Sequence, residues 1–189
     1  MNVIRASMLA LIGFVPSVTV GWTEPVQAPQ SIQINETADS YELSVPISRL
    51  IMTVPKAGLK QDKDVKGGST EGPTYFNFQD RTLNLVISGW FEPEGAFVGI
   101  EKFWQRETEA WSRRGLPAPQ RVTFQKIEGW EAIVYDIPFS LGSNSHIRAQ
   151  WVEAGTWIDV HMSITSEHPS SESRDKLTAV LKAIKVSKK

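Results

Sequence analysis

Hydrophobic and polar residues alternate along several stretches of the chain, and the first stretch predicts a strand. In residues 40–47 every second residue is apolar or aromatic, which is the period of a half-buried strand. Two more apolar runs, 75–79 and 83–91, flank the polar residues 80–82 and predict a hairpin. The second run carries apolar residues on both faces, so we expect a central strand that is covered on both sides.

The spacing of apolar residues changes to that of a helix after this hairpin. The residues that make its aromatic stripe are Phe97, Ile100, Phe103, Trp104 and Trp111. Arg113 and Arg114 suit the negative end of a helix dipole, and Gly115 can take the left-handed conformation that ends a helix. We expect the stripe to pack into the core rather than to hold a cofactor.

Four further strands are predicted at 121–127, 130–138, 146–153 and 156–165. Turns are expected at Glu128-Gly129 and Ala154-Gly155, and a loop rich in Gly, Ser and Asn at 140–145. These connections are too short for parallel crossovers, so the strands form an antiparallel meander.

A second amphipathic helix is predicted over residues 171–186, with Ser170 or Ser171 as its N-cap. Its apolar stripe contains Leu177, Val180, Leu181 and Ile184. The predicted fold class is therefore α+β, with an antiparallel sheet of about six to seven strands packed with two main helices.

The order of these elements over residues 40–187 resembles that of PsbP-like α-β-α sandwich domains. Exported members of that family end with a strand and helix similar to residues 157–163 followed by 177–184. The resemblance implies that fold. It also implies a non-catalytic role, because most members are binding or accessory proteins rather than enzymes.

Composition excludes several classes of protein. The chain has 189 residues, 41% of them hydrophobic, which suits a single domain. It has no cysteine, so disulfides, zinc-thiolate sites, thiol nucleophiles and lipidated cysteine anchors are excluded. A formal net charge of −1 provides no global attraction to nucleic acid or anionic membranes.

The N-terminal residues 1–28 are interpreted as a secretory signal peptide. Arg5 precedes an apolar run at 8–15, which is too short to span the ~30 Å core of a bilayer. We expect cleavage after Ala28, with cleavage after Gly21 as the alternative. Residues 29–39 then form a linker, 40–189 form one domain, and the protein is exported to a periplasm or, as the alternative, the extracellular space.

The last predicted hairpin carries the most informative polar residues. With a turn at 154–155, Arg148 lies opposite His161 and Gln150 lies opposite Asp159. One face then holds His146, Arg148, Gln150, Trp157, Asp159 and His161. An Asp-His-Arg group could bind a carboxylate or transfer protons, and Asp159 could raise the proton affinity of His161. The interpretation that we favour is structural, a polar outer face held together by cross-strand pairs.

Tryptophan and lysine residues provide the remaining candidates. Of the seven Trp, Trp90, Trp130 and Trp157 are not placed by alternation, and they are either buried or available for recognition. The polar loop 56–73 contains Lys60 and Lys63, which are candidates for docking a partner. No motif predicts a cofactor or a metal site.

These observations favour an exported, non-enzymatic binding or accessory domain that recognises a protein or a small ligand. One alternative is a periplasmic immunity or inhibitor protein that masks a toxin or an enzyme. Another is a small enzyme that uses the Asp-His-Arg face. The expected partner is a protein or small ligand, with no nucleic acid and no membrane span.

Overall fold

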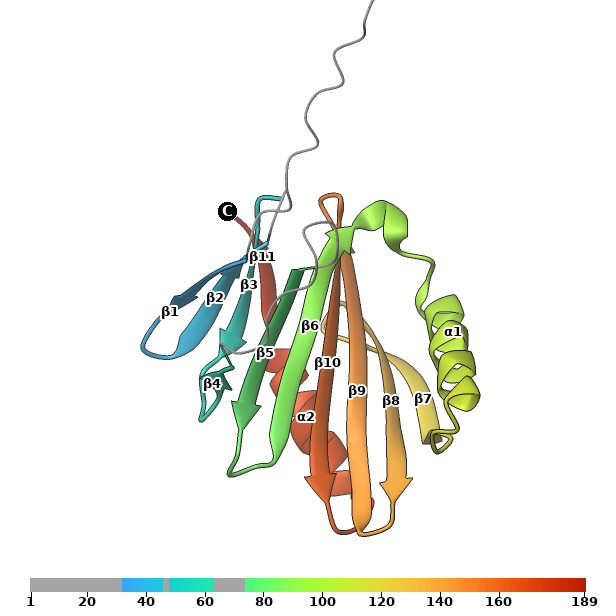
Figure 1. Ribbon diagram of the computed structural model, residues 1–189. Helices are drawn as coiled ribbons and strands as arrows, with labels where there is room; N and C mark the ends of the chain where they lie inside the picture. Colours follow the sequence, from blue (N-terminus) through green and yellow to red (C-terminus); the bar gives the residue numbers. More distant parts are fainter. Residues whose placement is uncertain (1–31, 46–47, 63–73) are drawn as a thin grey trace, which may run out of the picture.

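The computed structural model describes residues 32–45, 48–62 and 74–189, whose strands form two antiparallel sheets (Figure 1). The predicted signal peptide, Lys63 and most of the loop 56–73 lie outside the described residues. Within the described part, an α+β fold with two α-helices and a seven-stranded antiparallel sheet confirms the predicted fold class.

The larger sheet contains the predicted meander. Its strands lie in the order β4 (Lys60–Gln61), β5 (Thr74–Asp80), β6 (Leu85–Pro93), β10 (Thr156–Ser166), β9 (Gly142–Glu153), β8 (Trp130–Phe139) and β7 (Gln120–Ile127). Positive φ at both residues of 128–129 and 154–155 is typical of two-residue hairpin turns, so both predicted turns are confirmed. The expected loop at 140–145 is wrong, because β8 and β9 pair as far as Phe139 and Gly142.

The smaller sheet was largely missed by the sequence pattern. It contains β1 (Gln33–Glu36), β2 (Ser40–Ser44), β3 (Leu50–Pro55) and β11 (Lys185–Lys188) in that order. Strand β1 falls within the stretch 29–39 that the sequence assigned to a linker, and it pairs with β2. The C-terminal helix ends before the predicted residue 186, because the chain continues as β11 along β3.

The helix α1 (Ile100–Arg113) ends, and the helix α2 (Ser171–Ala183) begins, where their sequences suggest. Ser170 caps α2, and its hydroxyl oxygen accepts the backbone N–H of Ser173 at 3.0 Å, which satisfies one of the free donors of the first turn. Gly115 follows α1 with φ +67, the left-handed conformation expected there. A short 3-10 helix, η1 (Glu94–Ala96), precedes α1.

The apolar core lies on one face of the seven-stranded sheet. It joins buried side chains of both sheets and α2, among them Leu43, Met52, Ile87, Ile158 and Leu177. In Figure 1, α2 lies behind the seven-stranded sheet, and α1 lies to the right, beside β7 and β8. The aromatic side chains of α1 reach the opposite face of the sheet, which contains the candidate site.

Asp136 on β8 connects α2 to the β7 end of the sheet. Its carboxylate accepts hydrogen bonds from Arg121 Nε at 2.7 Å, from Ser145 Oγ at 2.8 Å and from Arg174 of α2. Burial acts to raise the pKa of Asp136, but these hydrogen bonds outweigh it and lower the pKa. Arg121 has φ +50 and lies where the β7–β8 register shifts between Gln120 and Thr123.

We expect Asp136→Ala to lower the free energy of unfolding by about 3 kcal/mol, because it leaves the facing arginines without their buried partner. Urea denaturation monitored by circular dichroism would measure the change. Glu172→Ala is the matched control, since it removes an exposed carboxylate paired with Lys176 in α2 and should leave stability nearly unchanged. Equal losses in the two variants would contradict the structural role of Asp136.

Candidate functional site

The register of the last hairpin is as predicted from its turn. Arg148 pairs with His161, and Gln150 pairs with Asp159. The alternate residues of β10 are in the apolar core, so the polar side chains all point to the face that α1 covers. We call His146, Arg148, Gln150, Asp159 and His161 the polar cluster.

Four of the five side chains of the polar cluster are buried and His161 is partly buried, so the expectation of a solvated outer face is wrong. The exposed fraction is 8% for Arg148, 1% for Gln150 and 0% for Asp159. The physical reason is the cover provided by aromatic side chains, several of them from α1. Phe103 is the one buried residue of α1, and it lies close to Arg148.

Arg148 and Asp159 form the centre of the cluster. Arg148 Nε lies 2.6 Å from Asp159 Oδ1, in contact as an ion pair rather than as an aligned hydrogen bond. The guanidinium carbon lies 4.5 Å from the ring centre of Trp90 and 4.9 Å from that of Phe103. The two aromatic faces thus stabilise the buried cation from the sheet and from α1.

Gln150 forms a hydrogen bond to the carboxylate of Asp159. Its Nε2 donates to Asp159 Oδ2 at 3.0 Å, which leaves the amide oxygen Oε1 without a partner. Burial raises the pKa of Asp159, while Arg148 and Gln150 oppose that shift. Burial also raises the pKa of the half-buried Glu92, and the charge of Asp159 adds to the effect.

Two histidines and a tyrosine lie beside the ion pair. His146 Nδ1 is 3.0 Å from His161 Nε2, and Tyr135 Oη is 3.2 Å from the same nitrogen. Burial lowers the pKa of His146 to about 4. It also lowers the pKa of His161 well below its ordinary value, with Arg148 adding to the shift. The expectation that Asp159 raises the proton affinity of His161 is therefore wrong, because that carboxylate is paired with Arg148.

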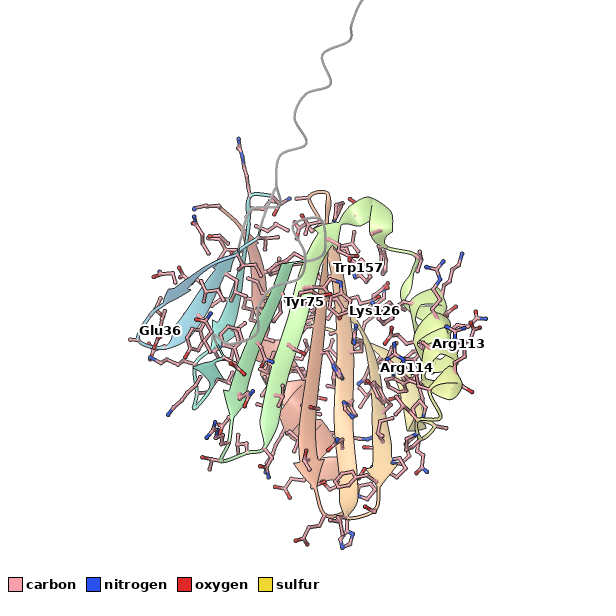
Figure 2. All side chains as sticks on the ribbon, viewed as in Figure 1. Glu36, Tyr75, Arg113, Arg114, Lys126 and Trp157 are labelled. Carbon is pink, nitrogen blue, oxygen red and sulfur yellow. The ribbon has the colours of Figure 1, made fainter. Side chains whose placement is uncertain are left out.

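An aromatic band runs from the sheet toward α1 beside the cluster. Its neighbouring ring centres are 5.7–6.1 Å apart. The band consists of Tyr75, Trp90, Trp157, Phe97 and Phe103. Figure 2 shows Trp157 and Tyr75 on the same side of the sheet. Of the tryptophans that the sequence left unplaced, Trp130 is fully buried, Trp157 is 5% exposed and Trp90 is half-buried.

Buried polar atoms without a hydrogen-bond partner are concentrated on this face. Among the described residues there are nine such side-chain atoms, and two of them belong to the Arg148–Asp159 ion pair. Six of the others lie on the same face by strand register, and Ser143 Oγ lies on the other. The six are Asn77 Oδ1, Trp90 Nε1, Asn144 Oδ1, His146 Nε2, Gln150 Oε1 and Trp157 Nε1.

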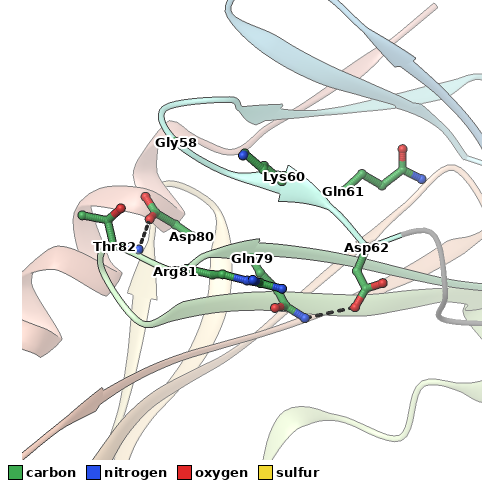
Figure 3. A pocket seen from close by; sticks show the side chains of 8 residues that line it. All are labelled: Gly58, Lys60, Gln61, Asp62, Gln79, Asp80, Arg81 and Thr82. Atoms are coloured by element: carbon green, nitrogen blue, oxygen red, sulfur yellow. Dashed lines mark hydrogen bonds between the residues drawn. The ribbon is translucent and has the colours of Figure 1, made fainter.

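A second candidate lies at β4 and the β5–β6 turn, where Lys60 lines a cleft of about 580 Å³ (Figure 3). Polar side chains of this cleft already have protein partners. Gln79 Nε2 donates to Asp62 at 3.0 Å, and Asp80 Oδ1 accepts two backbone N–H groups of the turn. Lys63 lies outside the described residues. We therefore regard the polar cluster as the stronger candidate.

Tyr135, Trp90 and Phe103 belong to the site but were not assigned to it from the sequence. The expected six-residue loop at 140–145 left the register of the preceding strand open. The shorter turn that forms instead places Tyr135 opposite His146. Pairing of β6 with β10 places Trp90 opposite Asp159, and no local pattern predicts that long-range pairing.

No protein family and no curated protein matches the chain. Among solved structures, the chain is similar to a crystal structure from Bacteroides thetaiotaomicron, with 10% sequence identity and a TM-score of 0.45. The similarity covers 75% of this chain and 45% of that chain, less than half of its length. These values carry no argument about function.

The described residues provide neither a metal-binding group nor a membrane-spanning helix. No group of three or more His, Cys, Asp or Glu side chains there could hold a metal ion. Nor does that part of the chain contain a helix with the length and hydropathy required to cross a membrane.

We expect the free energy of unfolding to fall as the pH drops from about 6.5 toward 4. Burial lowers the pKa of His146 in the folded chain to about 4. As the pH falls, the unfolded chain therefore binds a proton at this imidazole before the folded chain does. This difference lowers the free energy of unfolding by up to about 3 kcal/mol. His161 acts in the same direction, whereas Asp159, with its raised pKa, acts in the opposite one. Urea denaturation at several pH values would measure the slope.

Comparison with His146→Gln isolates the contribution of this imidazole, because the variant should show a shallower loss of stability over the same pH range. His168→Gln is the control, since it removes an exposed imidazole in the loop before α2 and should follow the unmodified chain. A slope that His146→Gln leaves unchanged would contradict the burial of a neutral His146.

Proposed function

We propose that the chain is a binding or accessory domain that recognises a small polar ligand at the polar cluster. The observation that carries this proposal is the concentration of six unpartnered, buried polar atoms on one face of the sheet. In proteins such atoms are rare and call for a specific explanation. A ligand bound beside Gln150, Trp90 and Trp157, whose unpartnered atoms lie on neighbouring positions of β9, β6 and β10, provides one.

The energetic cost of these atoms supports the proposal. A buried donor or acceptor without a partner costs about 1–3 kcal/mol, so several together would offset a large part of the 5–15 kcal/mol by which a typical domain is stable. A face with a purely structural role would lower its energy by carrying apolar side chains instead. Binding is a reason to retain polar ones.

The attachment of α1 also suits a binding role. The sheet beneath the cluster is held by pairing on both sides of β6, β10, β9 and β8. Helix α1, in contrast, buries only Phe103 and contacts Tyr135 through the rings of Trp104 and Trp111. Ligand sites are commonly formed between a rigid element, here the sheet, and a less firmly packed one, here α1.

Native mass spectrometry of the full-length chain, expressed with its N-terminal segment and recovered from the exported fraction, tests this function. We expect a small molecule to remain bound to the folded chain. Gln150→Met should reduce its occupancy at least tenfold, because the variant removes the unpartnered amide oxygen while keeping the length of the side chain. The ratio of loaded to unloaded protein is the measured quantity.

Trp151→Phe is a matched control, because the Trp151 indole packs against the core on the other face and donates to Glu153 at 3.1 Å. It should retain the bound molecule. The proposal would be overturned by unloaded protein in every preparation, together with a crystal structure in which ordered waters alone satisfy the six atoms.

We also propose that the domain works outside the cytoplasm. Support comes from the sequence of residues 1–28, and the order of strands and helices that resembles PsbP-like domains agrees with an exported binding or accessory protein. Intact-mass measurement of the exported chain should show a new N-terminus at Pro29, or at Trp22 for the alternative cleavage site. An exported fraction that retains residues 1–28, or a chain confined to the cytoplasm, would contradict this.

A further inference from the structure

We infer that the ligand of the polar cluster is an uncharged ring bearing several hydroxyl groups, that is, a carbohydrate or cyclic polyol. This inference rests on the proposed binding function. It comes from the chemistry of the unpartnered atoms, from the charge balance of the cluster and from the aromatic side chains beside it.

The unpartnered atoms include both donors and acceptors. The indole N–H groups of Trp90 and Trp157 can only donate, and the amide oxygen of Gln150 can only accept. The orientation of that amide is set by the adjacent carboxylate, because its Nε2 donates to Asp159. A hydroxyl group is both donor and acceptor, so a ligand with several hydroxyls can satisfy both kinds of atom.

Charged ligands satisfy only part of this site. An anion would leave the Gln150 oxygen without a donor, and an ammonium ion without hydroxyls would leave both indoles without an acceptor. Arg148 already occupies a face of Trp90, and its charge is balanced by Asp159. The centre of the cluster is therefore occupied by a paired cation and anion, which favours a neutral partner.

The strand register sets the size of the group that could bridge these atoms. Gln150, Asp159 and Trp90 stand directly opposite one another on β9, β10 and β6, and Tyr75 continues the row on β5. With neighbouring strands about 4.8 Å apart, the backbone positions of Gln150 and Trp90 are separated by roughly 10 Å along this row. A pyranose ring with its hydroxyls has comparable dimensions. Tyr75, which is 40% exposed, offers an aromatic surface at the open end of the row.

The unpartnered atoms are buried, so entry of the ligand requires α1 to shift together with Phe97 and Phe103. Glycines at both ends of the helix permit this shift. Gly99 has φ +89 and Gly115 has φ +67, and a Cβ at either would meet no atom within 4 Å. Because glycine populates several regions of backbone conformation, both positions are suited to act as hinges.

Saturation-transfer NMR on the full-length chain tests the ligand class. The probes are the methyl glycosides of glucose, galactose and mannose, with sodium acetate and choline chloride as charged counterparts. We expect transfer to at least one glycoside and to neither ion. Gln150→Met and Tyr75→Ala should each weaken glycoside binding at least fivefold, and Trp151→Phe should leave it unchanged. Tyr75 is exposed, so Tyr75→Ala keeps the test valid even where Gln150→Met fails to fold.

Two outcomes overturn the inference. Transfer to acetate or choline that is lost in Gln150→Met would show a charged ligand, which rejects the carbohydrate class while leaving the proposed binding function standing. Absence of transfer to all three glycosides, or transfer that neither variant at the cluster affects, also rejects it. The proposed function itself is decided separately, by whether the exported chain retains a bound molecule that depends on Gln150.

Discussion

The Arg148–Asp159 ion pair is the interaction on which the arrangement of the candidate site depends. Two charges that are almost fully buried are costly unless each is well paired, so their surroundings are tightly constrained. The cation needs Asp159 on β10, Trp90 on β6 and Phe103 on α1. One guanidinium therefore connects three elements that are distant in sequence. Its contact with Phe103 helps to fix the position of α1 on the sheet.

Burial, with the charge of Arg148 as a smaller cause, lowers the pKa of both histidines beside the pair and keeps them neutral. A fixed positive charge and a water-poor environment both disfavour imidazolium, and His161 is affected by both. The site thus offers paired charges, neutral imidazoles, indole N–H groups and an amide oxygen. That combination is suited to recognising hydroxyl or amide groups by hydrogen bonds, since it contains no unbalanced central charge that would select for an ion.

Local sequence signals account for much of the fold and for the membership of the polar cluster. The turn at 154–155 was sufficient to place Arg148 opposite His161, and the cap of α2 was read from Ser170. Strands β1 and β11 were missed because each has only four residues, and their pairing is set by long-range neighbours. Burial of the cluster was missed for a related reason, because it depends on where the aromatic side chains of α1 pack against the sheet.

The bulge near Arg121 has a consequence at the edge of the molecule. Strand β7 is the last in its sheet, and a long, regular edge strand invites another chain to add to it. The left-handed conformation of Arg121 and the shift in register beside it interrupt the row of backbone groups that such an addition would need. The residue that ties β7 to Asp136 therefore also makes this edge of the sheet a poor template for an added strand.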